Sequence, residues 1–320
     1  MSTIRILFLG TPEFARAHLQ SLLDDDHFEV VGVVSQPDRP AGRKMQLQPS
    51  PVKALAVEKN IPVITPEKVN TPEVLEQIQA FKAEAAVVVA FGQILPQKFL
   101  DFYPRRVVNV HGSLLPQWRG AAPIQRAVMA GDKVSGVCLQ VMVKKLDAGD
   151  VIGLYTLPIG ENTTAMELHD QMIPLGQKLL NIDFMDYLRG HVAAIAQDES
   201  KVTYAEKLDK AESLIDWSWP AEKIHAHIRG MTMGPGTYSI RKGKKLKIIT
   251  SRILDASSVN GKAGVLSVSS SGGLEVTCGV GRLSLEEVQP ESKPKMKSKD
   301  YLLGHPVEAG EQLGGSLESK

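Results

Sequence analysis

The sequence predicts two domains of different class, a doubly wound α/β domain followed by a small all-β barrel. In the amino-terminal half, apolar strand patterns alternate with helical patterns, which is typical of a mostly parallel sheet covered by helices. After residue 208 the pattern changes to short strands separated by glycine and serine turns, which favours an antiparallel barrel. The length of 320 residues exceeds what a single hydrophobic core usually supports, so two domains are expected.

The first domain is predicted to span residues 1–189. Its expected strands cover residues 4–9, 29–34, 62–64, 85–90 and 107–110. Its expected helices cover residues 12–23, 51–59, 72–81 and 164–188. The continuous apolar run at 85–90 is typical of a central parallel strand. Residues 137–143 and 150–158, joined by a turn, predict an antiparallel pair added at the sheet edge.

A polar stretch without periodicity indicates a linker at residues 190–208, ahead of a second domain at 209–320. The strands expected in that domain cover residues 237–240, 245–249, 264–268, 274–278 and 282–288. Five short strands at this spacing favour an OB-like barrel, the fold named for oligonucleotide binding.

Composition narrows the functional class. The net charge of +1 gives no global sign of a nucleic-acid partner, and no cysteine or histidine spacing indicates a metal site. Cys138 and Cys278 lie in apolar runs, which predicts buried thiols in a reducing compartment. The amino terminus lacks a signal-peptide pattern, and no run approaches the roughly twenty apolar residues of a membrane span. We therefore expect a soluble, cytoplasmic monomer that needs neither a membrane nor a metal.

Asn109 and His111 are the first candidates for catalysis. They stand two residues apart at the end of an expected strand, so both side chains project from the same face. Gly112 and Pro116 follow, which places the pair at the carboxyl end of a strand, where open α/β sheets bind ligands. The structural alternative is that Asn109 caps a turn and that His111 is satisfied within the core or a loop.

Asp147 lies in a turn at residues 147–150 and completes the groups that acyl transfer to an amine requires. The amide supplies a donor for the developing oxyanion, the imidazole moves protons, and the carboxylate steadies the charged imidazole. The structural alternative is an ordinary turn aspartate ahead of Gly149.

A dinucleotide-binding fold is the competing interpretation of the first strand, which ends at Gly10. The further glycines of that fingerprint are absent, because Pro12 and Glu13 stand in their place, and no phosphate-binding lysine motif occurs. Gly10 instead fits a tight turn beside a substrate, with Pro12 in the first turn of the helix.

Several ordered motifs resemble the methionyl-tRNA formyltransferase family. They are residues 10–15 (GTPEFA), 36–43 (QPDRPAGR), 109–116 (NVHGSLLP), 118–125 (WRGAAPIQ) and 147–150 (DAGD). The resemblance implies a Rossmann-like formyltransferase domain followed by a tRNA-binding barrel. It also implies transfer of a formyl group from the cosubstrate 10-formyltetrahydrofolate to the amino group of methionine on initiator tRNA. The family's catalytic trio maps onto Asn109, His111 and Asp147.

Two segments are predicted to bind the folate. The resemblance assigns one of them to Ser113, Leu114, Leu115 and Pro116. The second follows the central strand and offers an apolar slot with backbone hydrogen bonds for a pterin ring. Its expected contacts are Phe91, Gly92, Ile94 and Leu95. The alternative for this second segment is an ordinary strand-to-helix loop, with Phe91 and Ile94 in the core.

A long loop at residues 36–53, rich in proline and glycine, carries four cations against one acid. The cations are Arg39, Arg43, Lys44 and Lys53, and the acid is Asp38. A solvated loop is the structural alternative. With the family resemblance, Arg39, Arg43 and Lys44 are predicted to contact tRNA, and Arg43 is expected at the end of the acceptor stem. Contacts of this kind recognise phosphates and the shape of the RNA end.

The second domain is the more basic part of the chain. From residue 206 onward, 17 Lys and Arg face 14 Asp and Glu, whereas 20 face 22 before it. Basic clusters occupy residues 241–247 and 293–299. We expect tRNA contacts at Lys207, Lys244 and Lys245, with strongly salt-dependent binding. The alternative is that these clusters are solvated faces.

The trio alone does not identify the acceptor, because other formyl-transferring enzymes share it. Glycinamide ribonucleotide, a sugar nucleotide or water are alternative acceptors, and the basic loop and barrel favour tRNA. A noncatalytic RNA-binding protein would have lost the trio, which is intact here. One segment departs from the family: residues 231–236 keep a proline but lack the tryptophan that the family commonly carries there.

Overall fold

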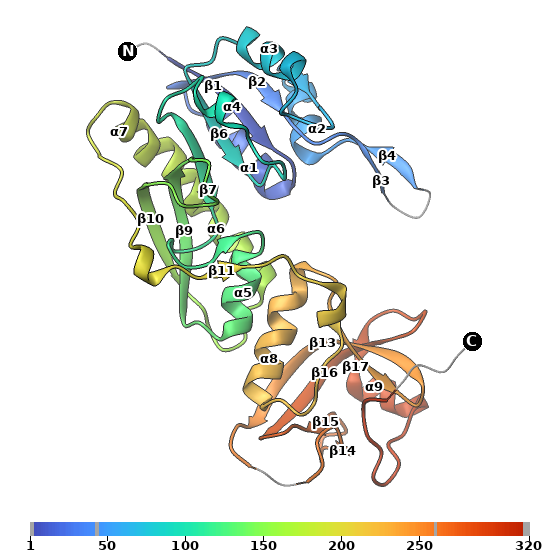
Figure 1. The fold of residues 1–320 in the computed structure, drawn as a ribbon. Helices are drawn as coiled ribbons and strands as arrows, with labels where there is room; N and C mark the ends of the chain where they lie inside the picture. The colour runs from blue at the N-terminus through green and yellow to red at the C-terminus, as the bar shows by residue number, and fades with distance from the viewer. Residues whose placement is uncertain (1–2, 42–44, 259–260, 316–320) are drawn as a thin grey trace. The chain divides into compact units, whose positions relative to one another are not determined.

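The computed structural model describes residues 3–41, 45–258 and 261–315 (Figure 1). The chain divides into two compact units. The first consists of Met1–Gly120, Ser135–Leu157 and His169–Tyr204, and the second of Ala121–Val134, Pro158–Leu168 and Ala205–Lys320. Two segments that the sequence analysis assigned to the first domain, residues 121–134 and 158–168, therefore cluster with the second unit.

The first unit is built on a seven-stranded sheet. Its strands are β1 (Ile4–Gly10), β2 (Phe28–Val34), β5 (Val63–Ile64), β6 (Ala85–Val89), β7 (Val107–His111), β9 (Val134–Val141) and β10 (Val151–Pro158). The strand order is β10-β9-β7-β6-β1-β2-β5; the pairs from β5 to β7 are parallel, and β9 is antiparallel to β7. The predicted doubly wound, mostly parallel sheet with an antiparallel edge is confirmed. All five residues of β6 are buried, as its apolar run predicts.

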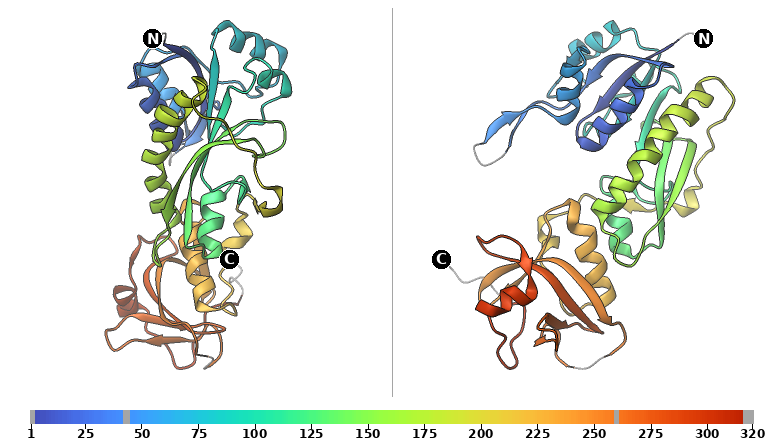
Figure 2. Two further views of the ribbon diagram at one scale, coloured as in Figure 1. Left: turned by 90° about the vertical axis from the view of Figure 1, so that its left-hand side faces the viewer. Right: turned by 180° about the vertical axis from the view of Figure 1, so that it is seen from behind.

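Helices cover this sheet, namely α1 (Glu13–Leu23), α2 (Pro51–Glu58), α3 (Pro72–Ala80), α4 (Gln97–Leu100) and α6 (Ala165–Lys178). α6 continues through a π-helical turn (Leu179–Phe184) into α7 (Met185–Leu188), and this long helix runs beside β9 and β10 (Figure 2). Ser50 and Thr71 cap α2 and α3 by accepting a backbone N–H, and each helix begins with a proline. These local start signals are why the sequence located both helices.

Gly10 ends β1 in close packing with its neighbours, which corrects the expected tight turn. An added Cβ would lie 2.7 Å from the Ala15 Cβ and 2.9 Å from the Val89 carbonyl oxygen. Glycine is therefore needed here because α1 and β6 approach the backbone closely.

Several shorter elements lie between these helices and strands or in the second unit. They are β3 (Arg39–Ala41), β4 (Gln46–Gln48), β8 (Arg119–Gly120), β11 (Tyr204–Ala205) and the 3-10 turns Glu199–Lys201, Lys210–Ser213 and Met231–Met233. The expected linker, residues 190–208, thus contains a helical turn and the whole of the short strand β11.

His18 is a fully buried histidine on α1. Its Nδ1 lies 2.7 Å from the Phe14 carbonyl oxygen, which only accepts, so Nδ1 carries the proton. Its Nε2 is buried without a hydrogen-bond partner among the described residues, and the backbone of Gly176 approaches it closely. Burial lowers the pKa of His18 to about 4. The folded protein therefore holds the neutral imidazole.

Acid is expected to destabilise the protein in part through His18. In the unfolded chain this histidine takes up a proton near pH 6.5, whereas in the folded protein it does so near pH 4, so stability falls as the pH drops from 6.5 toward 4. His18→Asn keeps a donor for the Phe14 carbonyl and does not titrate, so its Tm should change less with pH in this window. The exposed His191 gives the control His191→Asn, which should keep the wild-type slope. Equal slopes for wild type and His18→Asn would contradict this prediction.

The second unit contains a six-stranded antiparallel sheet. Its strands are β12 (Thr237–Arg241), β13 (Lys244–Asp255), β14 (Leu266–Val268), β15 (Leu274–Thr277), β16 (Arg282–Pro290) and β17 (Met296–Lys297). The order is β12-β13-β16-β15-β14, and β17 pairs with β16. An antiparallel domain after the α/β domain is confirmed, and β17 is a strand beyond the five expected.

Helices α5 (Pro123–Ala130), α8 (Ala221–Gly230) and α9 (Ser298–Gly304) accompany this sheet. None of these three helices was predicted from the sequence. α8 places Ala221, Ile224 and Ile228 in the core of the second unit together with Leu246 and Leu283 of the sheet. The signal was present as an apolar i, i+3, i+7 spacing, but the glycine and serine turns nearby favoured an all-β interpretation.

The segment that departs from the family, residues 231–236, begins with a buried residue and becomes exposed toward its end. Met231 is fully buried, and the Thr232 hydroxyl donates to the Arg229 carbonyl and accepts from the Met166 N–H. Trp217 is buried and its Nε1 donates to the Ser239 hydroxyl at 2.9 Å. Met231 is thus anchored in the core, and Thr232 closes the turn that follows α8.

Cys138 and Cys278 are free and buried, as predicted, and burial raises the pKa of each thiol to about 12. Both are therefore held as neutral thiols. Within residues 3–41, 45–258 and 261–315, no helix combines the length and apolar character that crossing a membrane requires.

Candidate active site

Asn109 and His111 lie at the carboxyl end of β7, two residues apart and so on one face of the sheet. Asn109 stands between Val88 of β6 and Gln140 of β9 in the strand register. No described residue forms a hydrogen bond with the Asn109 side chain, which is partly buried, so its amide is available to a ligand.

Asp147 comes from the turn between β9 and β10, and the fold brings it to His111. The His111 Nδ1 and the Asp147 Oδ2 are 3.8 Å apart, and both side chains are largely buried. The Asp147 carboxylate accepts from the Gly120 N–H and from the Gln140 Nε2, each at 2.9 Å. These two donors orient one oxygen toward His111 and hold the other against β9.

The other ring nitrogen of His111, Nε2, faces the backbone of the loop after β7. His111 Nε2 lies 3.0 Å from the Trp118 carbonyl oxygen, which only accepts, so Nε2 is the donor. The Nδ1 to Asp147 distance exceeds that of a hydrogen bond, and a second proton on Nδ1 would face the carboxylate. Nε2 therefore carries the proton of the neutral ring, and Nδ1 faces the Asp147 carboxylate.

Gly149 is required by the geometry of this turn. A Cβ at this position would overlap the carbonyl group of Val141. Asp147, two residues earlier, has a φ of +46°, a left-handed conformation that costs energy for a residue other than glycine. The turn is therefore held in a defined shape by packing against β9.

Gly149→Ala is expected to lower the free energy of unfolding by about 1–3 kcal/mol, the usual cost of overpacking, and to displace Asp147. The matched control is Gly304→Ala, because nothing lies within 4 Å of a Cβ added at Gly304. Chemical denaturation measures both effects. If Gly149→Ala proves as stable as Gly304→Ala, the close approach to Val141 is not needed.

The residues predicted to bind folate through the family resemblance form the loop after β7. Ser113 is fully buried and its Oγ donates to the Gln117 carbonyl at 2.7 Å, so the hydroxyl shapes the turn. Leu115 is buried, and Leu114 and Pro116 are partly buried. Their predicted folate contacts stay a prediction.

The segment after β6 divides into buried and exposed residues. Phe91 and Leu95 belong to the core of the first unit, and the Phe91 carbonyl accepts from Thr11 and Gln36. Gly92 is exposed with a φ of +86°. Ile94 is 90% exposed, so the alternative that placed Ile94 in the core is wrong.

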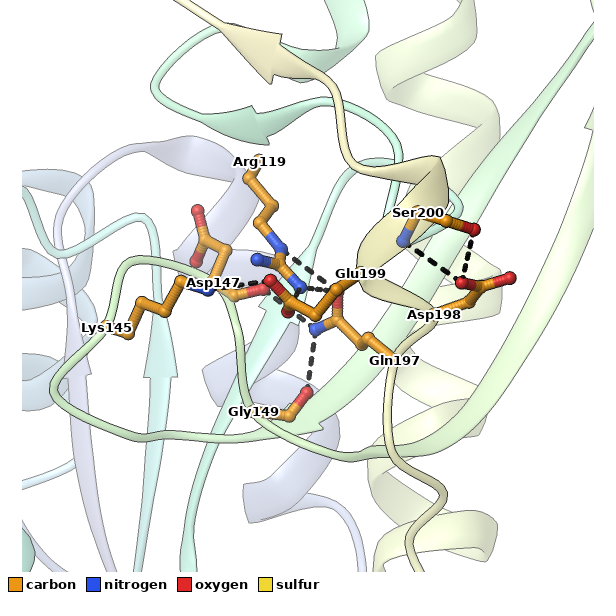
Figure 3. A network of polar contacts seen from close by, with 8 residues as sticks. All are labelled: Arg119, Lys145, Asp147, Gly149, Gln197, Asp198, Glu199 and Ser200. Atoms are coloured by element: carbon orange, nitrogen blue, oxygen red, sulfur yellow. Dashed lines mark hydrogen bonds and ion pairs between the residues drawn. The ribbon is translucent and has the colours of Figure 1, made fainter.

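Four polar residues near the site were given no role by the sequence: Arg119, Gln140, Gln197 and Glu199. They form hydrogen bonds with one another or with the Asp147 turn. Figure 3 shows the bonds of Arg119, Gln197 and Glu199. The sequence could have pointed to Gln140, because it is the single amide in the apolar run at 137–143. In the structure Gln140 is 1% exposed. Gln197 and Glu199 carried no such signal, since they lie in a polar stretch that was interpreted as a linker.

The basic residues predicted to contact tRNA differ in exposure and in pairing, and two of them lie outside the described residues. Arg39 is exposed and pairs with Glu67, whereas Arg43 and Lys44 lie outside the described residues. Lys207 and Lys244 are exposed. The Lys245 Nζ lies 3.9 Å from the centre of the Tyr238 ring.

Arg241 does not belong to the basic surface cluster expected at 241–247. It is buried and paired with the buried Glu311 at 2.7 Å. Its neighbour Lys242 pairs with Glu308. The cluster is therefore less positive than its sequence indicates, because a distant segment supplies two carboxylates.

Metal ligands are not gathered in the described part of the chain, where no group of three or more His, Cys, Asp or Glu side chains is placed to hold a metal ion.

Residues 4–181 match the formyl transferase family, and residues 207–306 match the formyl transferase C-terminal domain. The methionyl-tRNA formyltransferase of Bdellovibrio bacteriovorus is 54% identical over 98% of this chain and 100% of its own length. That of Bacillus subtilis is 41% identical over 98% of this chain and 99% of its own length. A solved N-formyltransferase of Helicobacter canadensis, in complex with folinic acid and dTDP-3-aminofucose, has a TM-score of 0.67 and 20% identity, covering 90% of this chain and 100% of that chain.

Proposed function

The chain belongs to the formyl transferase family, and from this premise we infer that it transfers a formyl group to the amino group of methionine on initiator methionyl-tRNA. It is an enzyme that uses a folate cosubstrate, and we propose that this cosubstrate is 10-formyltetrahydrofolate. The observation that carries the proposed mechanism is the meeting of Asn109, His111 and Asp147 at the end of β7, with 3.8 Å between the imidazole and the carboxylate.

The proposed reaction is direct acyl transfer through a tetrahedral intermediate. The methionine amine attacks the formyl carbon, and the Asn109 amide donates a hydrogen bond to the carbonyl oxygen as it gains negative charge. His111 accepts the proton that the amine loses and passes it to the folate nitrogen as the old carbon–nitrogen bond breaks. Asp147 stabilises His111 while its ring is charged.

The folate is proposed to lie against the two segments that follow β6 and β7. Ile94 offers an exposed apolar side chain, and the neighbouring Gly92 exposes its backbone. An apolar surface beside free backbone groups suits a flat heteroaromatic ring. In the loop after β7, backbone groups are the proposed contacts of Ser113, because its hydroxyl is already bonded within the turn.

Binding of the tRNA is proposed to use basic residues of the first domain, the linker and the second domain. We keep the division into a catalytic domain (1–189), a linker (190–208) and a tRNA-binding domain (209–320). Arg39 lies on the β3–β4 hairpin, and Arg43 and Lys44 belong to the same loop by sequence. Exposed Lys207, at the end of the linker, is a proposed phosphate contact, as are exposed Lys244 and its sequence neighbour Lys245 in the second domain.

The test is a formyl-transfer assay with 10-formyltetrahydrofolate and methionyl initiator tRNA, run beside elongator methionyl-tRNA and free methionine. Transfer confined to the initiator tRNA is the expected result. Release of formate without acylated tRNA would indicate a hydrolase. Binding of tRNA without turnover would indicate a noncatalytic protein.

Asp147→Asn is expected to lower the transfer rate by about ten- to a hundredfold, because interactions with a charged group contribute about 1.5–3 kcal/mol. The amide keeps the size of the carboxylate, so the fold should be preserved. Exposed Asp186, which contacts His191, gives the control Asp186→Asn. Single-turnover kinetics at saturating folate and tRNA measure the effect, and a wild-type rate for Asp147→Asn would remove Asp147 from the mechanism.

A further inference from the structure

The segment interpreted as a linker contacts the candidate active site. Gln197, Glu199 and Thr203 all come from it, and each bonds to a residue of the turn after β9 or of the loop after β7. Figure 3 shows Gln197 between the Arg119 guanidinium and the turn that carries Asp147 and Gly149. These hydrogen bonds indicate that the segment does more than connect two domains.

Gln197 uses both ends of its amide. Its Nε2 donates to the carbonyl oxygens of Asp147 at 2.8 Å and Gly149 at 2.7 Å. Its Oε1 accepts from Nε and Nη2 of Arg119 at 3.1 and 2.8 Å. The same side chain therefore closes the Asp147 turn and is itself fixed by a fully buried guanidinium.

Arg119 is in turn fixed by Glu199. Its Nη2 donates to Glu199 Oε1 at 2.7 Å, and Lys145, in the Asp147 turn, donates to Oε2 at 2.7 Å. Hydrogen bonds from Arg119 and then Lys145 lower the pKa of Glu199 to about 2. The carboxylate thus stays charged in any ordinary buffer, and the arrangement around Gln197 persists.

Thr203 holds the other neighbour of His111. Its Oγ1 accepts from the Trp118 N–H and its carbonyl accepts from the Arg119 N–H, both at 2.9 Å. Trp118, whose carbonyl accepts the hydrogen bond from His111 Nε2, has a φ of +61°. Asp147 and Trp118 therefore both adopt a costly left-handed conformation, and both are held by the same segment.

We propose that Gln197 is a positioning residue, which keeps the Asp147 turn in the shape that presents its carboxylate to His111. This inference rests on the catalytic roles proposed for Asp147 and His111. The competing explanation is that Gln197 serves only as the partner of buried Arg119 and affects stability alone. The positioning role depends on the Gln197 Nε2, which donates to the Asp147 turn, whereas the purely structural role depends on Oε1, which accepts from Arg119. A substitution that changes only Nε2 therefore separates the two explanations.

Gln197→Glu is that substitution. A carboxylate keeps the contact with Arg119, but it cannot donate to the carbonyls of Asp147 and Gly149. We expect a lower Tm, because the carboxylate faces two carbonyl oxygens to which it cannot donate. For the folded enzyme we expect unchanged KM values for folate and tRNA and a kcat lower by about ten- to a hundredfold. The control is Ser200→Ala in the same segment, whose hydroxyl bonds to Asp198 and which should keep full activity.

A double-mutant cycle with Asp147→Asn completes the test. If Gln197 acts through Asp147, Gln197→Glu should lower kcat in the wild type but cause little further loss in the Asp147→Asn protein. A wild-type kcat for Gln197→Glu, a change in KM alone, or losses that simply multiply would each overturn the proposal. If the glutamate variant fails to fold, Gln197→Ala takes its place in the cycle. Its kcat is then calculated per folded enzyme. Full activity of Asp147→Asn itself would instead contradict the proposed mechanism.

Discussion

Replacing His111 by alanine is expected to lower the rate of formyl transfer by about 10²- to 10⁴-fold, the range that a positioned general acid–base supplies. The ring sits at the end of β7 with Nε2 bonded to the Trp118 carbonyl and Nδ1 facing Asp147. Without it, the amine proton and the departing folate nitrogen lose their shared carrier. The measurement is the single-turnover rate of formyl-methionyl-tRNA formation.

His111 is only 6% exposed, so a truncated side chain also leaves a cavity. His111→Gln avoids this, because glutamine fills most of the space and can donate to the Trp118 carbonyl, yet it cannot relay a proton. Both variants should be slow, and His191→Ala, at an exposed histidine, should be normal. A folded His111→Gln protein with wild-type turnover would show that another group moves the proton.

Asn109→Asp is expected to lower the rate by about 10²- to 10³-fold, the typical cost of losing one oxyanion donor. The carboxylate has nearly the shape of the amide but donates no hydrogen bond and repels a developing negative charge. The Asn109 side chain forms no hydrogen bond with any described residue, so the change breaks no hydrogen bond among the described residues. Rates at saturating tRNA and folate measure the effect on the chemical step.

The matched control for this substitution is Asn60→Asp, because Asn60 is an exposed residue remote in sequence from the site. Asn60→Asp should keep full activity. If Asn109→Asp instead raises KM and leaves kcat unchanged, Asn109 would be a binding residue and the oxyanion would need another donor.

The pairing of Asn109 with His111 was predictable because it is local. Two residues on a strand share a face whatever the rest of the chain does, and the apolar runs of β6 and β7 marked those strands. The helix starts at Pro51 and Pro72 were equally local, since a capping residue and a proline are adjacent in sequence.

The basic surface shows where such local reasoning fails. Arg241 counts as a surface charge in sequence, but its strand turns it inward to meet Glu311, which lies 70 residues later. Burial of a charge depends on whether a partner arrives from elsewhere in the fold. The count of charged residues in the sequence therefore overstates how many positive charges lie on the surface of the second unit.

The sequence by itself determined the main parallel strands of the α/β domain with most of their helices, the polar pair on β7 and, through its motifs, the family. The tertiary structure decided that Asp147 meets His111, and that Gln197 and Thr203 support the residues on either side of that histidine. The reason is physical: periodicity and caps act within a few residues, whereas buried polar groups are satisfied by whichever distant segments the packing brings to them. The stretch at 190–208 has no periodicity, and only its hydrogen bonds reveal what it does.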